Sequence, residues 1–232
     1  MLNHHLLTRW FIGYEAQRKR MLKKAPVGPL RDFLSVPLPA LNTPFQHIPI
    51  LAVDFETTGL NAIQDKLLSV GCVELSHNQI KLASCYHQII QSQGDLTADN
   101  VSIHQITDDQ KNQGQPLALV VEQLLKRLRG KVMLVHFARI EREFLTQACL
   151  ELYGMAPPLA IIDTLVVAKK RLDKRDVAYD PSELRLSSLR AKYQLPKYHA
   201  HNALNDAVAT AELLLAQVNE RNEKTSLQQL II

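Results

Sequence analysis

Long apolar runs, signal-peptide features and cysteines are all scarce in this sequence. No apolar stretch reaches the roughly 18 residues that a membrane-spanning helix needs. The N-terminus lacks the charged-then-apolar order and the small-residue cleavage site of a signal peptide. The 3 cysteines, Cys72, Cys85 and Cys149, are an odd number in apolar-patterned segments, which argues against a disulfide framework or a zinc site. We therefore expect a cytoplasmic protein with reduced core thiols and no membrane partner.

Excess positive charge is also missing from most of the chain. The whole sequence has a net charge of +4, but residues 1–49 carry seven lysines and arginines against Glu15 and Asp32, so the remainder sums to about −1. We expect residues 1–47 to be a basic helical extension followed by an extended linker, marked by Pro26, Pro29, Pro37, Pro39 and Pro44. The basic face either contacts nucleic-acid phosphates or is a solvated helix face that packs on the domain through Trp10, Phe11 and Tyr14.

The most informative stretch is residues 50–60, Ile-Leu-Ala-Val-Asp-Phe-Glu-Thr-Thr-Gly-Leu. An apolar run that ends at a turn signal is typical of a buried central strand. Side chains alternate along a strand, so Asp54 and Glu56 share one face about 7 Å apart. Two buried carboxylates repel each other, and a hard divalent cation such as Mg²⁺ or Mn²⁺ would relieve that repulsion. The alternative is a solvated strand end with two unrelated acids.

A second titratable pair lies near the other end of the chain. The sequence from Asn202 onward is rich in alanine and leucine and has an apolar stripe at helical spacing. Asp206 falls near the start of this predicted helix, and His201 lies just before it. The helix dipole would account for an acid there, and His201 would then be a surface or capping histidine.

These two segments resemble the first and last motifs of the DEDDh (DnaQ-like) 3′–5′ exonucleases, the family of the proofreading epsilon subunit of bacterial DNA polymerase III. The resemblance covers about residues 48–218, and intervening segments fit it: Ile-His-Gln-Ile-Thr at 103–107, Ile-Ile-Asp-Thr-Leu at 161–165 and Leu-Ser-Ser-Leu at 186–189. Asp163 is expected to cap the helix that follows it instead of binding metal.

The middle acidic motif departs from the family pattern. Residues 136–145 read His-Phe-Ala-Arg-Ile-Glu-Arg-Glu-Phe-Leu, so Glu141 stands at the usual aspartate position and Phe137 replaces an asparagine. Glu143 is a competitor, but residues two apart on a helix do not share a face. We prefer Glu141; the alternative is a solvent-facing acid.

The resemblance implies an α/β architecture. Residues 48–220 would form an RNase H-like mixed five-stranded sheet flanked by helices, and residues 221–232 a tail. The patterns predict strands at about 49–55, 66–75, 79–90, 131–136 and 159–163, with a turn at His77 and Asn78. Helices are expected near 116–129, 139–153, 164–172, 183–193 and 202–220, and a loop and helix around 103–107.

The resemblance also implies the chemistry. Two divalent cations, Mg²⁺ or Mn²⁺, would be held by Asp54, Glu56 and Asp206, with Glu141 contacting one directly or through water. Two such ions activate water and stabilise the leaving 3′ oxygen. His201 would be the general base, a task suited to the ordinary pKa of histidine. The expected products are nucleoside 5′-monophosphates released from a free 3′ end.

Substrate contacts are expected around these acids. The turn that follows the metal strand, Thr57, Thr58, Gly59 and Leu60, would meet the terminal nucleotide. Ile103 and His104 resemble the family stretch beside that nucleotide; core packing for Ile103 and an ordinary loop position for His104 are the alternatives. Phe137 either stacks on a base or fills core.

Several functions remain open from the sequence. A DNA exonuclease acting on single strands or frayed 3′ ends is preferred; an exoribonuclease of the same fold and a weakly active binding module are the alternatives. Two protein partners are also considered, a DNA polymerase and a sliding clamp that would bind the C-terminal Gln-Gln-Leu-Ile-Ile. A frayed apolar tail is the simpler interpretation of those residues.

Overall fold

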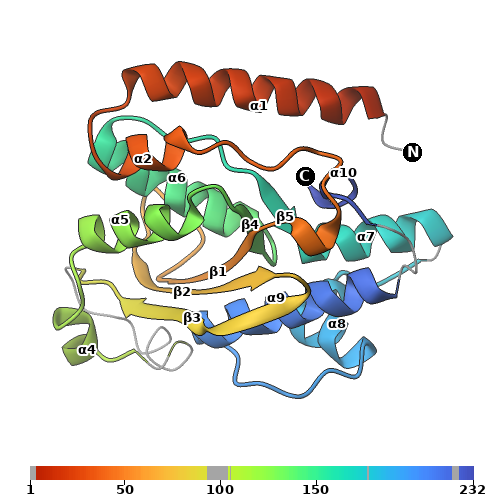
Figure 1. The fold of residues 1–232 in the computed structure, drawn as a ribbon. Coiled ribbons are helices and arrows are strands. Elements are labelled where there is room, and N and C mark those ends of the chain that lie inside the picture. Colours follow the sequence, from red (N-terminus) through yellow and green to blue (C-terminus); the bar gives the residue numbers. More distant parts are fainter. Residues whose placement is uncertain (1–3, 93–103, 105, 177, 221–224) are drawn as a thin grey trace.

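The protein forms one mixed sheet with helices on both faces (Figure 1). The computed structural model describes residues 4–92, 104, 106–176, 178–220 and 225–232, and of residues 4–12 it describes the backbone alone. The strand order is β3-β2-β1-β4-β5. The strands are β1 (Ile50–Thr57), β2 (Leu67–Ser76), β3 (Gln79–Ile89), β4 (Val132–Val135) and β5 (Ile161–Asp163). This confirms the predicted mixed five-stranded α/β sheet.

Strand β1 lies at the centre because both of its faces are covered. It pairs antiparallel with β2 and parallel with β4. Leu51, Val53 and Phe55 belong to the core on one face, whereas Ile50 and Ala52 belong to the core on the other. The apolar run before Asp54 is therefore continuous because the strand is buried on both sides.

The tight turn between β2 and β3 falls at the predicted residues. His77 and Asn78 have φ angles of 53° and 58°, the left-handed values that a two-residue hairpin requires. The long hairpin that results forms one edge of the sheet and supplies a wide surface on the face that carries α9 (Ala203–Asn219).

The predicted helices flank the sheet. Helix α9 packs against β1 and β2 from one side, and the opposite core includes residues of α5 (Leu117–Leu128) and α6 (Arg139–Tyr153). Further helices are α4 (Asp108–Asn112), α7 (Thr164–Arg175) and α8 (Leu186–Lys192), with the 3₁₀ turns η1 (Phe45–His47) and η2 (Pro181–Leu184). Among the residues described, no helix combines the length and the apolarity needed to cross a bilayer.

The N-terminal extension differs from the expected helix and extended linker. Helix α1 (His4–Lys24) is followed by a second helix, α2 (Pro29–Ser35), inside the segment predicted to be extended. Proline is tolerated in the first turn of a helix, so Pro29 begins α2 instead of preventing it. Leu30 and Leu34 of α2 are fully buried, and α2 packs on α5. The extension is thus part of the core.

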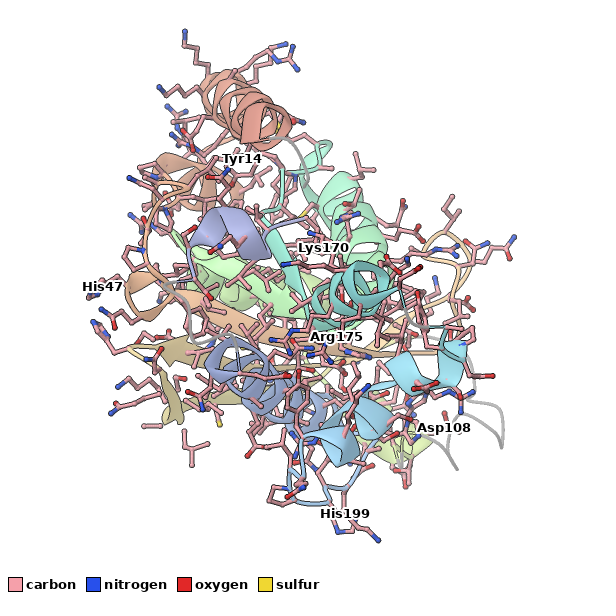
Figure 2. The ribbon with its side chains drawn as sticks, turned by 90° about the vertical axis from the view of Figure 1, so that its right-hand side faces the viewer. Tyr14, His47, Asp108, Lys170, Arg175 and His199 are labelled. Atoms are coloured by element: carbon pink, nitrogen blue, oxygen red, sulfur yellow. The ribbon has the colours of Figure 1, made fainter. Side chains whose placement is uncertain are left out.

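Helix α1 is held by its inward face. Tyr14 is 6% exposed, and in Figure 2 it lies between α1 and the body of the protein. Arg18 is also buried; it pairs with Glu15 and donates a hydrogen bond to the carbonyl of Leu34 on α2. Packing by Tyr14 agrees with the alternative in which the helix packs on the domain through its aromatic side chains. The side chains of Trp10 and Phe11 lie outside those described.

The C-terminal residues are not a frayed tail, and that expectation was wrong. They form a short helix, α10 (Leu227–Leu230), and Leu227, Leu230 and Ile231 are at most 1% exposed. The Ile232 N–H donates to the carbonyl of Ile161 on β5 at 3.0 Å. Burial of these apolar side chains argues against a clamp-binding peptide, which would have to present them to a partner.

Candidate active site

The three acids of the first and last motifs meet at one point. Asp54 and Glu56 project from β1, and Asp206 comes from the first turn of α9. Each offers a carboxylate oxygen, and these oxygens all lie within 4.8 Å of one another. Glu56 and Asp206 are buried and Asp54 is half-buried. Side chains separated by some 150 positions therefore share one cluster, as the predicted cation site requires.

A glycine on the neighbouring strand allows this approach. Gly71 on β2 is the register partner of Asp54. A Cβ atom at Gly71 would lie 2.1 Å from the backbone of Ala203 and Leu204, a distance at which no side chain fits. The start of α9 therefore rests directly on the backbone of β2, which brings Asp206 down to β1.

The clustered acids are electrostatically strained. Burial raises the pKa of Asp54 well above its ordinary value, and the charges of Glu141, Asp206 and Glu56 raise it further. Burial also raises the pKa of Asp206, although a hydrogen bond from Tyr198 opposes that shift. Such a group of carboxylates holds its full negative charge only when a cation compensates it.

The donor set fits divalent cations. All ligands on offer are hard carboxylate oxygens, which Mg²⁺ and Mn²⁺ prefer. Oε1 of Glu56 and Oε2 of Glu141 are buried and have no hydrogen-bond partner within the described part of the chain. Buried polar atoms without a partner are costly, and a bound cation would satisfy them.

Glu141 lines the same cavity from the first turn of α6. It is 3% exposed, and burial raises its pKa to about 8. Glu143, the competing acid, is half-exposed and pairs with Arg139 at 3.1 Å outside the cavity. The structure therefore brings Glu141, and not Glu143, beside Asp54.

His201 stands at the wall of two adjoining cavities. One, of about 600 Å³, contains Asp54, Glu141 and Asp206; the other, of about 440 Å³, lies on the β3 side. The His201 side chain is exposed, and its backbone has a left-handed φ of 65°. The imidazole is thus accessible from the cavity that holds the acids.

His104 lies on an acid of the cluster. Its Nδ1 contacts a carboxylate oxygen of Glu56, and its ring centroid is 6.5 Å from that of His201. The ring also lines the cavity of the acids, and its predicted contact with the terminal nucleotide stays a prediction. Ile103, predicted with it, lies outside the described residues.

The turn after β1 is organised by its own hydrogen bonds. The Thr57 hydroxyl donates to the carbonyl of Gly59 at 2.7 Å, and the Lys66 N–H donates to the Thr58 hydroxyl at 2.9 Å. Thr57 and Leu60 line the cavity of the acids, and Leu60 is 67% exposed. Thr58 and Gly59 build the turn itself and do not line that cavity.

Phe137 is held in an unusual conformation at the cavity rim. Its φ is 72° and its side chain is 45% exposed, although bulky residues rarely adopt left-handed angles. Asp163 accepts the N–H groups of Phe137 at 3.1 Å, Ala138 at 2.8 Å and Leu165 at 2.9 Å. The prediction that Asp163 caps a helix is confirmed, and Phe137 projects into the cavity instead of filling core.

Some lining residues were missed by the sequence analysis. Tyr198, His136 and Arg185 all line the cavity of the acids. Tyr198 hydrogen-bonds Asp206, and Nδ1 of His136 lies 2.7 Å from the Thr164 hydroxyl. Tyr198 falls in an irregular segment without periodicity, so no sequence signal singled it out. His136 belongs to the quoted middle motif, which was the available signal for it.

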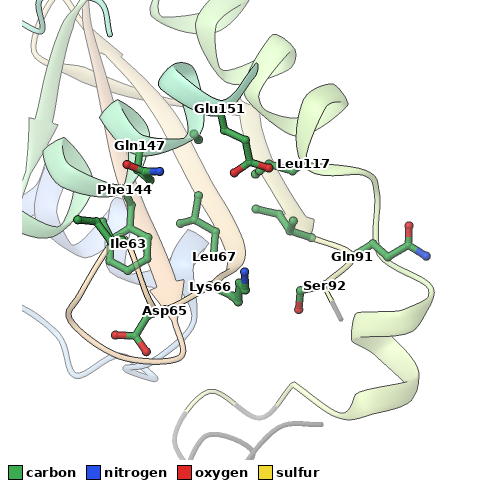
Figure 3. A pocket seen from close by; sticks show the side chains of 13 residues that line it. Ile63, Asp65, Lys66, Leu67, Gln91, Ser92, Leu117, Phe144, Gln147 and Glu151 are labelled. Atoms are coloured by element: carbon green, nitrogen blue, oxygen red, sulfur yellow. The ribbon is translucent and has the colours of Figure 1, made fainter. Parts of the chain in front are cut away.

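A separate cavity lies on the other side of the turn after β1. Figure 3 shows this space of about 280 Å³, where Phe144, Gln147 and Glu151 of α6 face Lys66 and Leu67. Its lining, within the described residues, includes none of the clustered acids. The acidic cavity is therefore the candidate active site.

Similar proteins are nucleases or polymerase components. A DNA polymerase III of the PolC type from Thermotoga petrophila is 28% identical over 171 residues, 74% of this chain but 12% of the relative. The DNA polymerase III subunit epsilon of Treponema pallidum is 26% identical over 75% of this chain and 78% of that protein. The nuclease domain of 3′hExo, a DEDDh family member bound to rAMP, matches with a TM-score of 0.62 and 16% identity, covering 77% of this chain and 98% of that one.

A family model described as an exonuclease, that of RNase T, matches residues 51–214. The matched segment begins on β1 and extends into α9, so it includes all the clustered acids and His201. The chain belongs to the RNase T exonuclease family.

Proposed function

We propose that this protein is a divalent-metal-dependent 3′–5′ exonuclease that releases nucleoside 5′-monophosphates from the 3′ ends of DNA. The observation that supports it most is the convergence of Asp54, Glu56 and Asp206 within 4.8 Å, beside His201. The exonuclease family match and the DNA polymerase III relatives are consistent with this reaction and with DNA as substrate.

The residues divide the chemistry between them. Asp54, Glu56 and Asp206 would hold two cations, with Glu141 beside them. Bound Mg²⁺ or Mn²⁺ would supply stabilisation for the charge that develops on the phosphodiester. The His201 imidazole takes the proton of the attacking water, whose oxygen bonds to phosphorus as the bond to the 3′ oxygen breaks. Phe137 and Leu60, both exposed at the rim, would contact the terminal bases, and Thr57 would contact the terminal nucleotide.

The test is digestion of 5′-labelled oligonucleotides with Mg²⁺ or Mn²⁺. Wild-type protein should shorten single-stranded DNA from a free 3′ end and should fail when that end is blocked. Asp54→Asn and His201→Ala should each lower the rate at least about a hundredfold, the scale of a lost catalytic group. Glu143→Gln, outside the cavity, is the matched control and should keep wild-type activity.

The second candidate function is that of an exoribonuclease, which we retain because the structural neighbour 3′hExo is bound to rAMP. Digestion of matched DNA and RNA oligonucleotides distinguishes the two candidates. Faster digestion of RNA than DNA would select the exoribonuclease, since discrimination depends on contacts to the 2′-hydroxyl. No release from DNA or RNA with either metal would refute both candidates and favour a binding module.

The basic face of α1 is proposed to contact phosphates of the bound strand. Lys19, Arg20, Lys23 and Lys24 are all exposed and continue along adjacent turns of the helix. Deleting the extension would remove the buried α2, so neutral substitution of these side chains is the cleaner experiment. Replacing Lys19 and Lys23 by Gln should flatten the dependence of log affinity on log salt, by about 0.7 for each phosphate of a single strand that the protein no longer neutralises. An unchanged slope would favour the solvated-face alternative.

A cytoplasmic location is also proposed, and the free state of all three cysteines supports it, two of them being buried and Cys85 partly so. Association with a DNA polymerase is proposed from the names of the relatives. Co-purification with the replicative polymerase would test it.

A further inference from the structure

Tyr198 stands out among the cavity residues because its hydroxyl reaches a clustered acid. It lies on the segment between α8 and α9 and lines the cavity beside Asp206. The hydroxyl and the Asp206 carboxylate share a hydrogen bond, to which the backbone N–H groups of His201 and Asn202 add. The Asn202 contact is 3.1 Å long. Asp206 therefore accepts hydrogen bonds from one side chain and from two consecutive backbone N–H groups.

Tyr198 is in turn held by a buried arginine. Arg190 of α8 is 3% exposed, and its guanidinium carbon lies 4.9 Å from the centre of the Tyr198 ring. The same guanidinium donates to the carbonyls of Ala209 at 2.8 Å and Pro196 at 2.9 Å, and pairs with Glu212 at 2.7 Å. One cation thus ties α8, the segment before Tyr198 and α9 together, and it stacks on the tyrosine.

We propose that Tyr198 is a positioning residue that fixes the Asp206 carboxylate, and through it the backbone of His201, while Arg190 holds the tyrosine in place. The inference rests on the proposed function, because it assigns a role toward the same metal site. Repulsion from Glu56 and Asp54 would otherwise turn Asp206 away from them, and a fixed donor on one side of Asp206 opposes that rotation. The His201 backbone, whose φ is a left-handed 65°, donates its N–H to the same carboxylate.

Tyrosine suits this role because its hydroxyl is carried on a rigid ring. The Arg190 guanidinium covers that ring, with its central carbon 4.9 Å from the ring centre, so the hydroxyl is held at a fixed place. A serine or water in the same place would have freedom to rotate that the stacked ring lacks.

The experiment uses the full chain and Mn²⁺ alone, without substrate. Titration of Mn²⁺ followed by calorimetry or electron paramagnetic resonance should show affinity about tenfold weaker in Tyr198→Phe than in wild type, the scale seen for groups that support metal ligands. Tyr193→Phe is the matched control: it also removes a hydroxyl bonded to an acid, Glu220, but outside the cavity. It should bind Mn²⁺ like wild type.

A second measurement needs no metal. Hydrogen exchange of the His201 and Asn202 amides should accelerate in Tyr198→Phe, while amides in the centre of α9 stay protected. Arg190→Lys keeps a charge for Glu212 but loses the planar stack, so it should weaken Mn²⁺ binding, and Tyr198→Phe should add little to it in the double variant.

The outcomes separate this inference from the proposed function. If wild type binds Mn²⁺, Asp54→Asn abolishes binding, and Tyr198→Phe changes neither affinity nor exchange, the positioning role is overturned and the exonuclease proposal stands. If wild type binds no Mn²⁺ and degrades no nucleic acid, the proposed function and this inference fall together.

Discussion

Asp163 at the end of β5 accepts the backbone N–H of Phe137 at 3.1 Å, 26 positions earlier in the chain. Phe137 comes two residues after β4, and Asp163 is the last residue of the parallel strand β5, where it is the register partner of Val135. The same carboxylate caps α7 and binds the N–H of Ala138 at the start of α6. One buried acid thereby joins two strand ends to two helix starts, at the point where Glu141 enters the cavity.

Asp163→Ala should destabilise the protein strongly. The change leaves three backbone donors without their acceptor, at a cost of about 1 kcal/mol or more each, so we expect a loss of about 3 kcal/mol. Urea unfolding measures it. Asp180→Ala, which removes the exposed cap of η2, should cost under about 1 kcal/mol; equal losses for the two variants would contradict the special position of Asp163.

Phe137→Asn should stabilise the fold while weakening substrate binding. Asparagine tolerates a φ of 72° better than phenylalanine, which should raise stability by about 0.5–1 kcal/mol. Loss of a stacking ring should raise KM for oligonucleotides at least about fivefold, since stacking contributes about 1–3 kcal/mol per base. Thermal unfolding and steady-state kinetics test the two parts, and an unchanged KM would mean that the ring does not touch substrate.

Gly71→Ala should damage the site through the backbone. The added methyl would lie 2.1 Å from Ala203 and Leu204, so α9 must shift away from β2. We expect a loss of about 3 kcal/mol or more in stability and a marked loss of Mn²⁺ affinity, since Asp206 moves with the helix. Gly13→Ala, on α1 with nothing within 4 Å, is the control and should be neutral or slightly stabilising.

Stability should fall in alkaline solution, in part through Cys149. Burial raises the pKa of its thiol to about 12 from an ordinary value of 9.0. The unfolded chain releases this proton near pH 9, whereas the folded protein retains it, so the thiol's contribution is complete below pH 9 and is lost as the pH rises toward 12. Cys149→Ala should remove a slope of up to about 1.4 kcal/mol per pH unit from urea-unfolding free energies measured between pH 9 and 11. Parallel curves for variant and wild type would disprove the assignment.

The sequence was sufficient where a local pattern carries the information. The alternation along residues 50–57 placed Asp54 and Glu56 on one face, and the helical stripe after Asn202 placed Asp206 at a helix start. The sequence was insufficient where contacts between distant segments determine the structure. The burial of α2, which begins at Pro29, and the packing of Ile231 beside β5 depend on surfaces that only the assembled fold creates.

The same limit applies within the site. No sequence pattern near Tyr198 predicts its contact with Asp206, because that contact requires Arg190 to hold an irregular segment against α9. Likewise, no sequence pattern links His104 to Glu56, and only the fold brings the two side chains into contact. Spacing predicts residues that share an element, and tertiary packing decides which others join them.

Asp54 and Asp206 sit on the central strand and on a late helix, so the acidic cluster cannot exist in a partly synthesised chain. A ribosome that has made the sheet but not α9 carries a nascent protein with no means of assembling the cation site. The proposed exonuclease activity would therefore be absent until synthesis has passed Asp206.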